Sequence, residues 1–295
     1  MPPSPYRGRF APSPTGPLHL GSMLAAFGSW LLARHACGQW LIRIEDVDPP
    51  REVPAAAEQQ LATLAAFGLH SDEPVQYQSH RHAPYRAASE RLLAQDKAFH
   101  CHCSRADLAG QHGIHRHCVS SQKRAQPAIR LRVPEGSHVT FDDALQGPIA
   151  QDVDRDVGDF VLLRADGYWA YQLAVVVDDA EQRISHVVRG ADLVDSTPRQ
   201  ILLQRALGVP TPHYLHLPLL LGADGQKLSK SLAAMPVDTD APLPVLRWLW
   251  AALGQPPAPL DAAVSVAELL QHAVAGFDPG RLQKESRSLA GSPPG

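Results

Sequence analysis

The chain has 295 residues and a formal net charge of −3, with 44% of its residues hydrophobic and 19% charged. This composition indicates an ordinary globular protein of about one or two domains and excludes a disordered, collagen-like or coiled-coil chain. Its apolar runs are too short to span a bilayer, and the N-terminus lacks a basic segment followed by an apolar one. We therefore expect a cytoplasmic protein without membrane contact. Cys37 lies apart from the other three cysteines and is expected to be a small buried residue.

The N-terminal third predicts alternating strands and helices. Strands are expected at residues 6–10 and 39–44, and helices at residues 18–37, 54–67 and 83–95. This order predicts an α/β fold with a Rossmann-like, doubly wound parallel sheet. Ligands bind such sheets at the carboxyl ends of the strands, so the turn-rich loop after the first strand and the acidic cluster after the second should face one crevice.

The composition changes near Phe99, where Cys, His, Arg and Ser become frequent and indicate an inserted module. The spacing C-x-C followed by H-x-x-C suits a closed, structural zinc site. The candidate ligands are Cys101, Cys103, His115 and Cys118. His117 is the alternative to His115, and the other interpretation is a set of free thiols in a histidine-rich loop. Residues 129–133 then alternate as an exposed strand would.

Apolar runs after the module indicate that the parallel sheet resumes. They lie at residues 159–163, 169–177, 184–188 and 214–221. A helix is predicted at residues 197–207, with Pro198 in its first turn, where proline is tolerated. The tail predicts one or two helices, including residues 244–253. We therefore expect two halves of the sheet domain at residues 1–98 and 159–231, an inserted zinc-bearing α/β module at 99–158, and a short helical C-terminal region at 232–295.

Two segments combine glycines with groups that suit a nucleotide. Residues 9–22 precede an expected helix N-terminus, where backbone N–H groups favour an anion. Residues 222–230 form a glycine-bracketed loop with two lysines, which can bring positive charge onto a triphosphate. A solvated hairpin tip is the alternative interpretation of this second segment.

These two segments resemble the defining motifs of class I aminoacyl-tRNA synthetases. They read Arg9-Phe10-Ala11-Pro12-Ser13-Pro14-Thr15-Gly16-Pro17-Leu18-His19-Leu20-Gly21-Ser22 and Lys227-Leu228-Ser229-Lys230. The form Phe-Ala-Pro-Ser-Pro-Thr-Gly, together with Arg-Ile-Glu-Asp, is similar to the glutamyl branch. The resemblance implies an ATP site at His19, Gly21, Ser22, Lys227, Ser229 and Lys230, with His19, Lys227 and Lys230 as the catalytic groups. Ser22 stands where many class I enzymes have a second histidine.

Free glutamate needs cationic donors for its two carboxylates and an acidic group for its ammonium. The resemblance places the glutamate-binding residues at Arg9, Ala11, Ser13, Glu45, Tyr171 and Arg189. Glu45 would take the ammonium, while Arg9 and Arg189 would take the carboxylates. Val175 stands where many glutamyl enzymes have a polar side chain facing the substrate, which predicts weaker glutamate binding.

The same residues allow a purely structural interpretation. Arg43, Glu45, Asp46 and Asp48 would then form a surface ion-pair group, which contributes little to stability. Tyr171 would be a core residue whose hydroxyl is satisfied within the protein.

The tail after Lys230 is short and contains only four basic side chains, Arg247, Arg281, Lys284 and Arg287. It lacks room for a large anticodon-binding domain, and this layout resembles the glutamyl-Q tRNA(Asp) synthetase family. Members activate L-glutamate without tRNA, using ATP and Mg2+, and esterify it to the cyclopentenediol of queuosine in the anticodon of tRNA(Asp). The resemblance also favours His115 over His117 as a zinc ligand. The alternatives are a shortened glutamyl-tRNA synthetase that charges the tRNA 3′ end and a non-catalytic nucleotide-binding paralogue.

Overall fold

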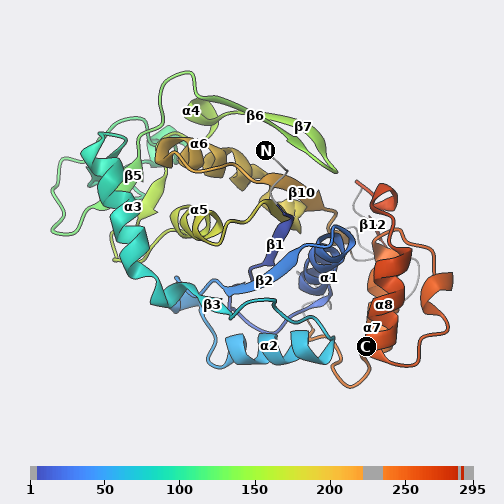
Figure 1. The fold of residues 1–295 in the computed structure, drawn as a ribbon. Coiled ribbons are helices and arrows are strands. Elements are labelled where there is room, and N and C mark those ends of the chain that lie inside the picture. The colour runs from blue at the N-terminus through green and yellow to red at the C-terminus, as the bar shows by residue number, and fades with distance from the viewer. Residues whose placement is uncertain (1–4, 222–234, 285–286, 289–295) are drawn as a thin grey trace.

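The computed structural model describes residues 5–221, 235–284 and 287–288 (Figure 1). Within these residues, no helix is long and apolar enough to cross a membrane. The helices are α1 (Leu20–His35), α2 (Ala56–Ala66), α3 (His82–Ala94), α4 (Val153–Asp156), α5 (Tyr171–Glu181), α6 (Thr197–Leu207), α7 (Pro242–Ala252) and α8 (Val266–Gly276). The strands are β1 (Arg7–Phe10), β2 (Gln39–Ile44), β3 (Gln76–Tyr77), β4 (Ala98–Cys101), β5 (Ala128–Leu131), β6 (His138–Asp143), β7 (Gly147–Asp152), β8 (Val161–Leu163), β9 (His186–Gly190), β10 (His213–Leu217), β11 (Leu220–Leu221) and β12 (Arg287–Ser288).

Two groups of mostly parallel strands form the centre of the molecule. In the first, β2 lies between β1 and β3 and pairs with both in parallel. In the second, the order is β7-β6-β10-β9, with β10 parallel to β6 and β9 and with β7 antiparallel to β6. The groups meet where β1 lies beside β9, and the Ser185 amide donates to the Arg7 carbonyl at 2.9 Å. The predicted Rossmann-like parallel sheet is confirmed.

Helices cover both faces of this sheet (Figure 1). On one face, α1 contacts β1, β2 and β9. A Cβ at Gly28 of α1 would come within 2.7 Å of the Leu217 side chain, so glycine permits this close approach. On the other face, α5 and α6 contact each other and lie on a second hydrophobic core. Cys37, just after α1, is exposed with φ of 51°, so the expectation that it is buried is wrong.

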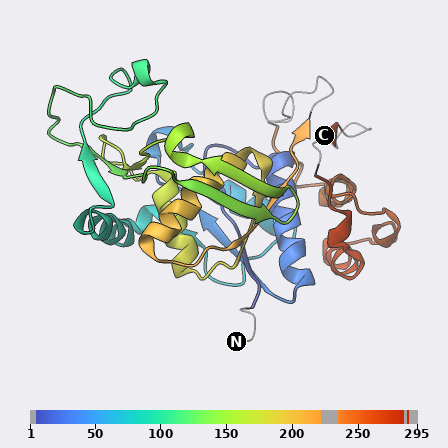
Figure 2. The ribbon, with the colours of Figure 1, turned by 90° about the horizontal axis from the view of Figure 1, so that it is seen from above.

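The cysteine- and histidine-rich segment lies at one end of the molecule, opposite the C-terminal helices (Figure 2). Its strands β4, β5 and β8 form a separate antiparallel sheet. The prediction that the parallel sheet resumes at residues 159–163 is therefore wrong, because β8 pairs back onto β5. β5 is also mostly buried rather than exposed, since it is the middle strand of the three.

The run at residues 169–177 belongs mainly to helix α5 and not to a strand. Periodicity alone does not separate a short buried strand from a helix that is buried on most sides. The hairpin β6–β7 comes from the segment expected to form the module, yet it pairs with β10 of the central sheet. The boundaries at residues 98 and 158 remain predictions.

The region after residue 235 contains α7 and α8, as the expected short helical region requires. Both helices pack against α1, and Trp250 of α7 is only 1% exposed. Its indole N–H donates to the Pro256 carbonyl at 2.7 Å. These helices share the largest hydrophobic core with the central sheet.

Candidate active site

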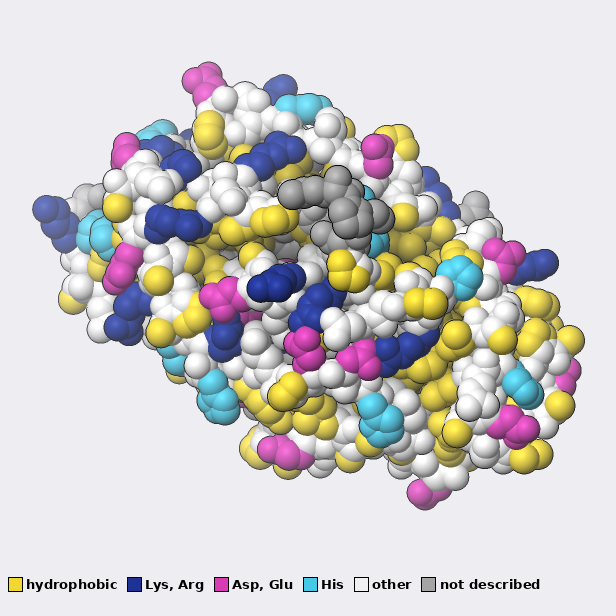
Figure 3. Space-filling model, viewed as in Figure 1, with side chains coloured by type: hydrophobic (Ala, Val, Ile, Leu, Met, Phe, Trp, Pro, Cys, Tyr) yellow, Lys and Arg dark blue, Asp and Glu magenta, His cyan; other side chains and the backbone are white. Residues whose placement is uncertain are grey.

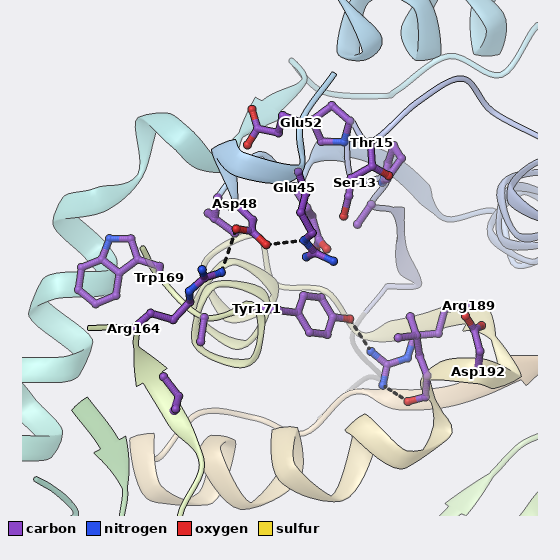
Figure 4. Close-up of a pocket in the computed structure, with 18 of the residues that line it drawn as sticks. Ser13, Thr15, Glu45, Asp48, Glu52, Arg164, Trp169, Tyr171, Arg189 and Asp192 are labelled. Carbon is purple, nitrogen blue, oxygen red and sulfur yellow. Dashed lines mark hydrogen bonds and ion pairs between the residues drawn. The ribbon is translucent and has the colours of Figure 1, made fainter. Parts of the chain in front are cut away.

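A cleft with a volume of about 1470 Å³ opens at the carboxyl ends of β1, β2 and β9 (Figure 4). This is the edge where parallel sheets bind ligands. The expected site residues that line it are Arg9, Ala11, Ser13, His19, Ser22, Glu45, Tyr171 and Arg189. Gly21 lies beside it in the first turn of α1. The expected residues Lys227, Ser229 and Lys230 lie outside the described residues.

The loop between β1 and α1 is held by hydrogen bonds from two other segments. The Glu45 amide, just after β2, donates to the Pro12 carbonyl at 2.9 Å. The side-chain amide of Gln60, on α2, donates to the carbonyls of Ser13 at 3.0 Å and Gly16 at 2.7 Å. Gln60 is only 2% exposed, but its role is not visible in the sequence because a glutamine on a predicted helix has the pattern of a surface residue.

His19 caps the N-terminus of α1 and faces the cleft. Its Nδ1 accepts from the amides of Gly21 at 3.1 Å and Ser22 at 3.3 Å, while the Ser22 hydroxyl lies 3.1 Å from Nε2. A Cβ at Gly21 would lie 3.1 Å from the imidazole, so glycine lets the ring lie against the helix. The partial positive charge of this helix end favours a bound anion.

Buried charges support the floor of the cleft. Arg9 is 3% exposed, and its Nε and Nη2 donate to the Asp179 carboxylate at 3.1 and 3.3 Å. Arg43 has no exposed surface and contacts Asp179 at 2.7 Å and Glu45 at 3.4 Å. The interpretation of Arg43 and Glu45 as a surface ion pair is therefore wrong.

Burial and the neighbouring arginines set the charge of these carboxylates. Burial raises the pKa of Glu45, and the nearby Arg43 and Arg9 offset this only in part. Burial alone would also raise the pKa of Asp179, but its ion pairs with Arg9 and Arg43 outweigh burial and lower the pKa. Asp179 is thus the ionised counter-ion of Arg9 and Arg43, while Glu45 remains short of partners for its negative charge.

Arg189 and Tyr171 lie at the other side of the floor, where they point toward each other (Figure 4). Nη1 of Arg189 donates to the Tyr171 hydroxyl at 3.3 Å, and Nη2 donates to Thr197 Oγ1 at 2.8 Å. Burial raises the pKa of Tyr171, so its hydroxyl keeps its proton and can donate to a ligand. Behind Arg189, its Nε donates to Nε2 of His216 at 3.0 Å.

His216 and its partner Asp143 are not among the site residues expected from the sequence. His216 has no exposed surface, and its Nδ1 lies 2.6 Å from Asp143 Oδ2. A histidine inside an apolar strand was the available signal, because buried polar side chains are nearly always hydrogen-bonded. Asp179, at the end of the apolar run in α5, gave a similar signal.

Val175 does not face the cleft. It is 1% exposed within the second hydrophobic core and is not among the described residues that line the cleft. Tyr171 begins α5 at the cleft, and Val175 lies one turn further along the helix, inside the core. The interpretation of this position as substrate-facing is wrong.

The four candidate metal ligands come together, with their ligand atoms within 4.8 Å of one another. The Sγ atom of Cys118 lies 3.7 Å from that of Cys103 and 3.8 Å from that of Cys101. Two thiolates on one tetrahedral zinc, with Zn–S bonds of about 2.3 Å, would be about 3.8 Å apart. His115 is buried, whereas His117 is exposed and outside the cluster.

A carboxylate orients the histidine of this cluster. Nδ1 of His115 lies 2.9 Å from Asp159 Oδ2, and this contact turns Nε2 toward Cys101 Sγ at 3.2 Å. Histidines that bind metals commonly hydrogen-bond a carboxylate through the other ring nitrogen. A Cβ at Gly158, where φ is 67°, would come within 2.3 Å of the His115 carbonyl, so only glycine fits behind the cluster.

The module also forms a basic wall of the cleft. Arg105, Arg124 and Arg130 of this wall lie in the module, and Arg164 follows β8. Arg164 donates to Asp48 at 2.9 Å across the cleft (Figure 4). Cys103 lines the same wall, so the metal-ligand cluster adjoins the cleft. On the face in Figure 3, basic side chains are more frequent over the module half than over the C-terminal helices.

Comparison with known proteins gives consistent matches. The sequence pattern of the family described as "tRNA synthetases class I (E and Q), catalytic domain" matches residues 6–242. The chain is 67% identical to the glutamyl-Q tRNA(Asp) synthetase of Xanthomonas campestris pv. campestris (strain 8004), over 95% of this chain and 94% of that protein. It is 51% identical to the protein of the same name from Neisseria meningitidis serogroup C, over 95% of this chain and 98% of that protein. A crystal structure of a glutamate tRNA ligase from Elizabethkingia meningosepticum, in complex with its amino acid, has a TM-score of 0.80 and 26% identity, over 97% of this chain and 67% of that one.

Proposed function

Because the chain belongs to the class I tRNA synthetases of the glutamate and glutamine branch, and within them to the glutamyl-Q tRNA(Asp) synthetases, we propose that it activates L-glutamate with ATP and transfers it to tRNA(Asp). The acceptor is the cyclopentenediol of queuosine in the anticodon. The observation that carries the proposal is the part of the cleft floor where the guanidinium groups of Arg9 and Arg189, the carboxylate of Glu45 and the phenol of Tyr171 lie beside a helix N-terminus. This set matches the charges of glutamate.

In the proposed complex, Glu45 takes the ammonium of glutamate, while Arg9 and Arg189 take its two carboxylates. Arg9 pairs with Asp179 through Nε and Nη2, which leaves Nη1 for the substrate. Tyr171 adds a hydroxyl beside Arg189, and Ala11 and Ser13 form the adjoining part of the wall. Because Arg9, Glu45 and Arg189 are buried, their interactions with a bound charge are stronger than in water.

Adenylate formation needs positioning and charge stabilisation rather than a protein nucleophile. The α-carboxylate of glutamate attacks the α-phosphate of ATP, pyrophosphate leaves, and a mixed anhydride remains. His19 and the N-terminus of α1, with Gly21 and Ser22, hold the phosphates. Lys230 stabilises the transition-state charge with support from Lys227 and Ser229. Bound Mg2+ supplies further neutralisation of the phosphates.

In the second step, a hydroxyl of the queuosine cyclopentenediol attacks the anhydride carbonyl and AMP leaves. The basic wall of Arg105, Arg124, Arg130 and Arg164 adjoins the cleft and suits the phosphates of an RNA substrate. The anticodon stem-loop of tRNA(Asp) would lie along this wall.

The cluster of Cys101, Cys103, His115 and Cys118 holds a structural Zn2+ in our proposal. Three thiolates and one imidazole fill a tetrahedral shell, which leaves no open position for catalysis. The thiolate spacings and the contact between His115 and Asp159 support this assignment. Bound zinc would fix the module and therefore the basic wall beside the cleft.

Locating the transferred glutamate tests the proposed function. The protein is incubated with ATP, Mg2+, radiolabelled glutamate and tRNA(Asp) carrying queuosine, and the RNA is digested into fragments. We expect label in the anticodon fragment, and no label with tRNA(Asp) that lacks queuosine. Label on the 3′-terminal adenosine would instead establish a shortened glutamyl-tRNA synthetase. Absence of both label and glutamate-dependent pyrophosphate exchange would support the non-catalytic alternative.

A further inference from the structure

Three buried side chains follow one another across the central sheet and end at the glutamate pocket. Asp143 ends β6, His216 lies in β10, and Arg189 lies in β9. β10 is the strand between β6 and β9, and His216 is directly opposite Arg189 in the strand register. Asp143 and His216 are 3% and 0% exposed, and neither belongs to the described wall of the cleft. A role for them must therefore act through Arg189.

The surroundings of Asp143 make it an ionised acceptor. Its Oδ1 accepts the backbone amides of Gln146 at 2.7 Å, Leu145 at 3.0 Å and His216 at 3.2 Å. Burial alone would raise the pKa of Asp143, but the hydrogen bonds from the His216 ring and from these amides outweigh burial and lower the pKa. An ionised carboxylate only accepts hydrogen bonds, so the Nδ1 of His216, 2.6 Å away, must carry the proton.

This arrangement leaves a lone pair on Nε2 of His216. That atom accepts the Nε–H of Arg189 at 3.0 Å, and Thr197 Oγ1 lies 3.3 Å from it. Burial lowers the pKa of His216, in keeping with a neutral ring. A proton on Nε2 of His216 would point at the Nε–H of Arg189, so that two hydrogen-bond donors would face each other. With Nε bound to His216 and Nη2 bound to Thr197, the guanidinium has a fixed orientation, with Nη1 beside the Tyr171 hydroxyl.

We propose that Asp143 and His216 are positioning residues for glutamate recognition. Asp143 fixes the tautomer of His216, and His216 holds Arg189 so that its Nη1 meets a glutamate carboxylate. The inference rests on the proposed function, which assigns glutamate to this pocket. Neither residue touches the substrate, and their effect appears in glutamate binding rather than in ATP binding.

Asp143→Asn tests the tautomer with little change in volume. The new amide can donate to Nδ1, which moves the His216 proton to Nε2, opposite the Arg189 donor. In glutamate-dependent pyrophosphate exchange we expect the KM for glutamate to rise about 10- to 100-fold, while the KM for ATP stays within about twofold. Asp142→Asn is the matched control, because Asp142 is the exposed neighbour on the same strand. A glutamate KM equal to that of wild type, or equal losses for both substrates, would overturn the proposal.

Two substitutions at His216 distinguish its role as a hydrogen-bond acceptor from its contribution to packing. His216→Gln retains an amide oxygen that can accept from Arg189 Nε, whereas His216→Leu removes any acceptor. We expect a glutamate KM closer to wild type for His216→Gln than for His216→Leu, with the KM for ATP unchanged in both variants. Equal glutamate KM values for both variants would count against an acceptor role.

The wild-type protein gives a test that does not depend on folding of the variants. 15N NMR of histidine-labelled protein reports which ring nitrogen of His216 carries the proton. We expect protonated Nδ1 and unprotonated Nε2 at neutral pH, and the opposite tautomer would overturn the proposal. Wild-type protein without glutamate-dependent exchange contradicts the proposed function, whereas normal wild-type exchange with an unchanged Asp143→Asn KM contradicts only the positioning role.

Discussion

Glu45 combines burial with an incomplete set of partners. The residue is 7% exposed and its carboxylate contacts Arg43 at 3.4 Å, but Arg43 donates more closely to Asp179, at 2.7 Å. Burial therefore keeps the pKa of Glu45 above its ordinary value. A substrate ammonium would supply the missing positive charge, so binding of glutamate should favour the ionised form of Glu45.

We predict that the KM for glutamate rises as the pH falls through the raised pKa of Glu45. The protonated carboxyl does not pair with the ammonium, and the loss begins above the ordinary pKa of 4.5 because the pKa is raised. Pyrophosphate exchange measured between about pH 8 and about pH 5 checks this. Glu45→Gln should raise the KM at neutral pH about 100-fold and remove this pH dependence. Identical pH profiles for the two proteins would contradict the prediction.

The side chains that face the cleft were predictable, whereas those behind it were not. Arg9, Glu45 and Arg189 lie in recognisable motifs at strand ends, where a parallel sheet brings ligand-binding groups together. Asp143 and His216 are 73 positions apart in the chain, and their pairing depends on the order of strands. Local sequence patterns do not contain this order, so the support of Arg189 became visible only in the fold.

At the scale of elements, the clearest predictions had distinct boundary signals. β2 and α6 occupy the predicted residues, because β2 is flanked by Gly38 and the acidic cluster and α6 has Pro198 near its start and Gly208 at its end. The segments of β8 and α5 were both expected to be strands of the parallel sheet, which is wrong. Both are short apolar runs without distinct boundary signals. The sheet that β8 joins depends on its long-range pairing with β5, and the apolar pattern of α5 reflects a helix that is buried on most sides.

We predict that the module depends on its metal ligands. Cys118→Ser should lower the amount of bound zinc and reduce glutamate transfer to tRNA more than pyrophosphate exchange, because Arg105, Arg124 and Arg130 of the basic wall lie in the module. His117→Ala is the matched control, since His117 lies next to Cys118 but outside the cluster, and it should retain its zinc. Elemental analysis of the two purified variants measures their bound zinc. Unchanged zinc in Cys118→Ser would remove this residue from the site.

At the scale of the whole molecule, the C-terminal helices and the sheet form one structural unit. Trp250 of α7 belongs to the same hydrophobic cluster as Phe27 of α1 and Trp40 of β2. Because α1 also begins at the cleft with His19 as its cap, the packing of α7 and α8 supports the wall that we propose to hold phosphates.

Trp250→Ala should therefore destabilise the entire protein by about 3–5 kcal/mol. We expect one unfolding transition, detected at the same denaturant concentration by circular dichroism and by loss of glutamate binding. Trp248→Ala is the control, because Trp248 is only partly buried against the same core. Its replacement should lower the free energy of unfolding by less. Two separate transitions would contradict a shared core.

The position of β10 sets an order for assembly during protein synthesis. β1 and β3 both pair with β2, and the three strands lie within residues 7–77, so this group can form on an early nascent chain. β10 lies between β6 and β9, both of which leave the ribosome before it. Until residue 217 has emerged, Arg189 lacks its neighbour His216, and Asp143 lacks the ring that it binds. A translational arrest shortly before this point would leave the proposed phosphate site partly formed and the proposed amino-acid pocket without its ordered arginine.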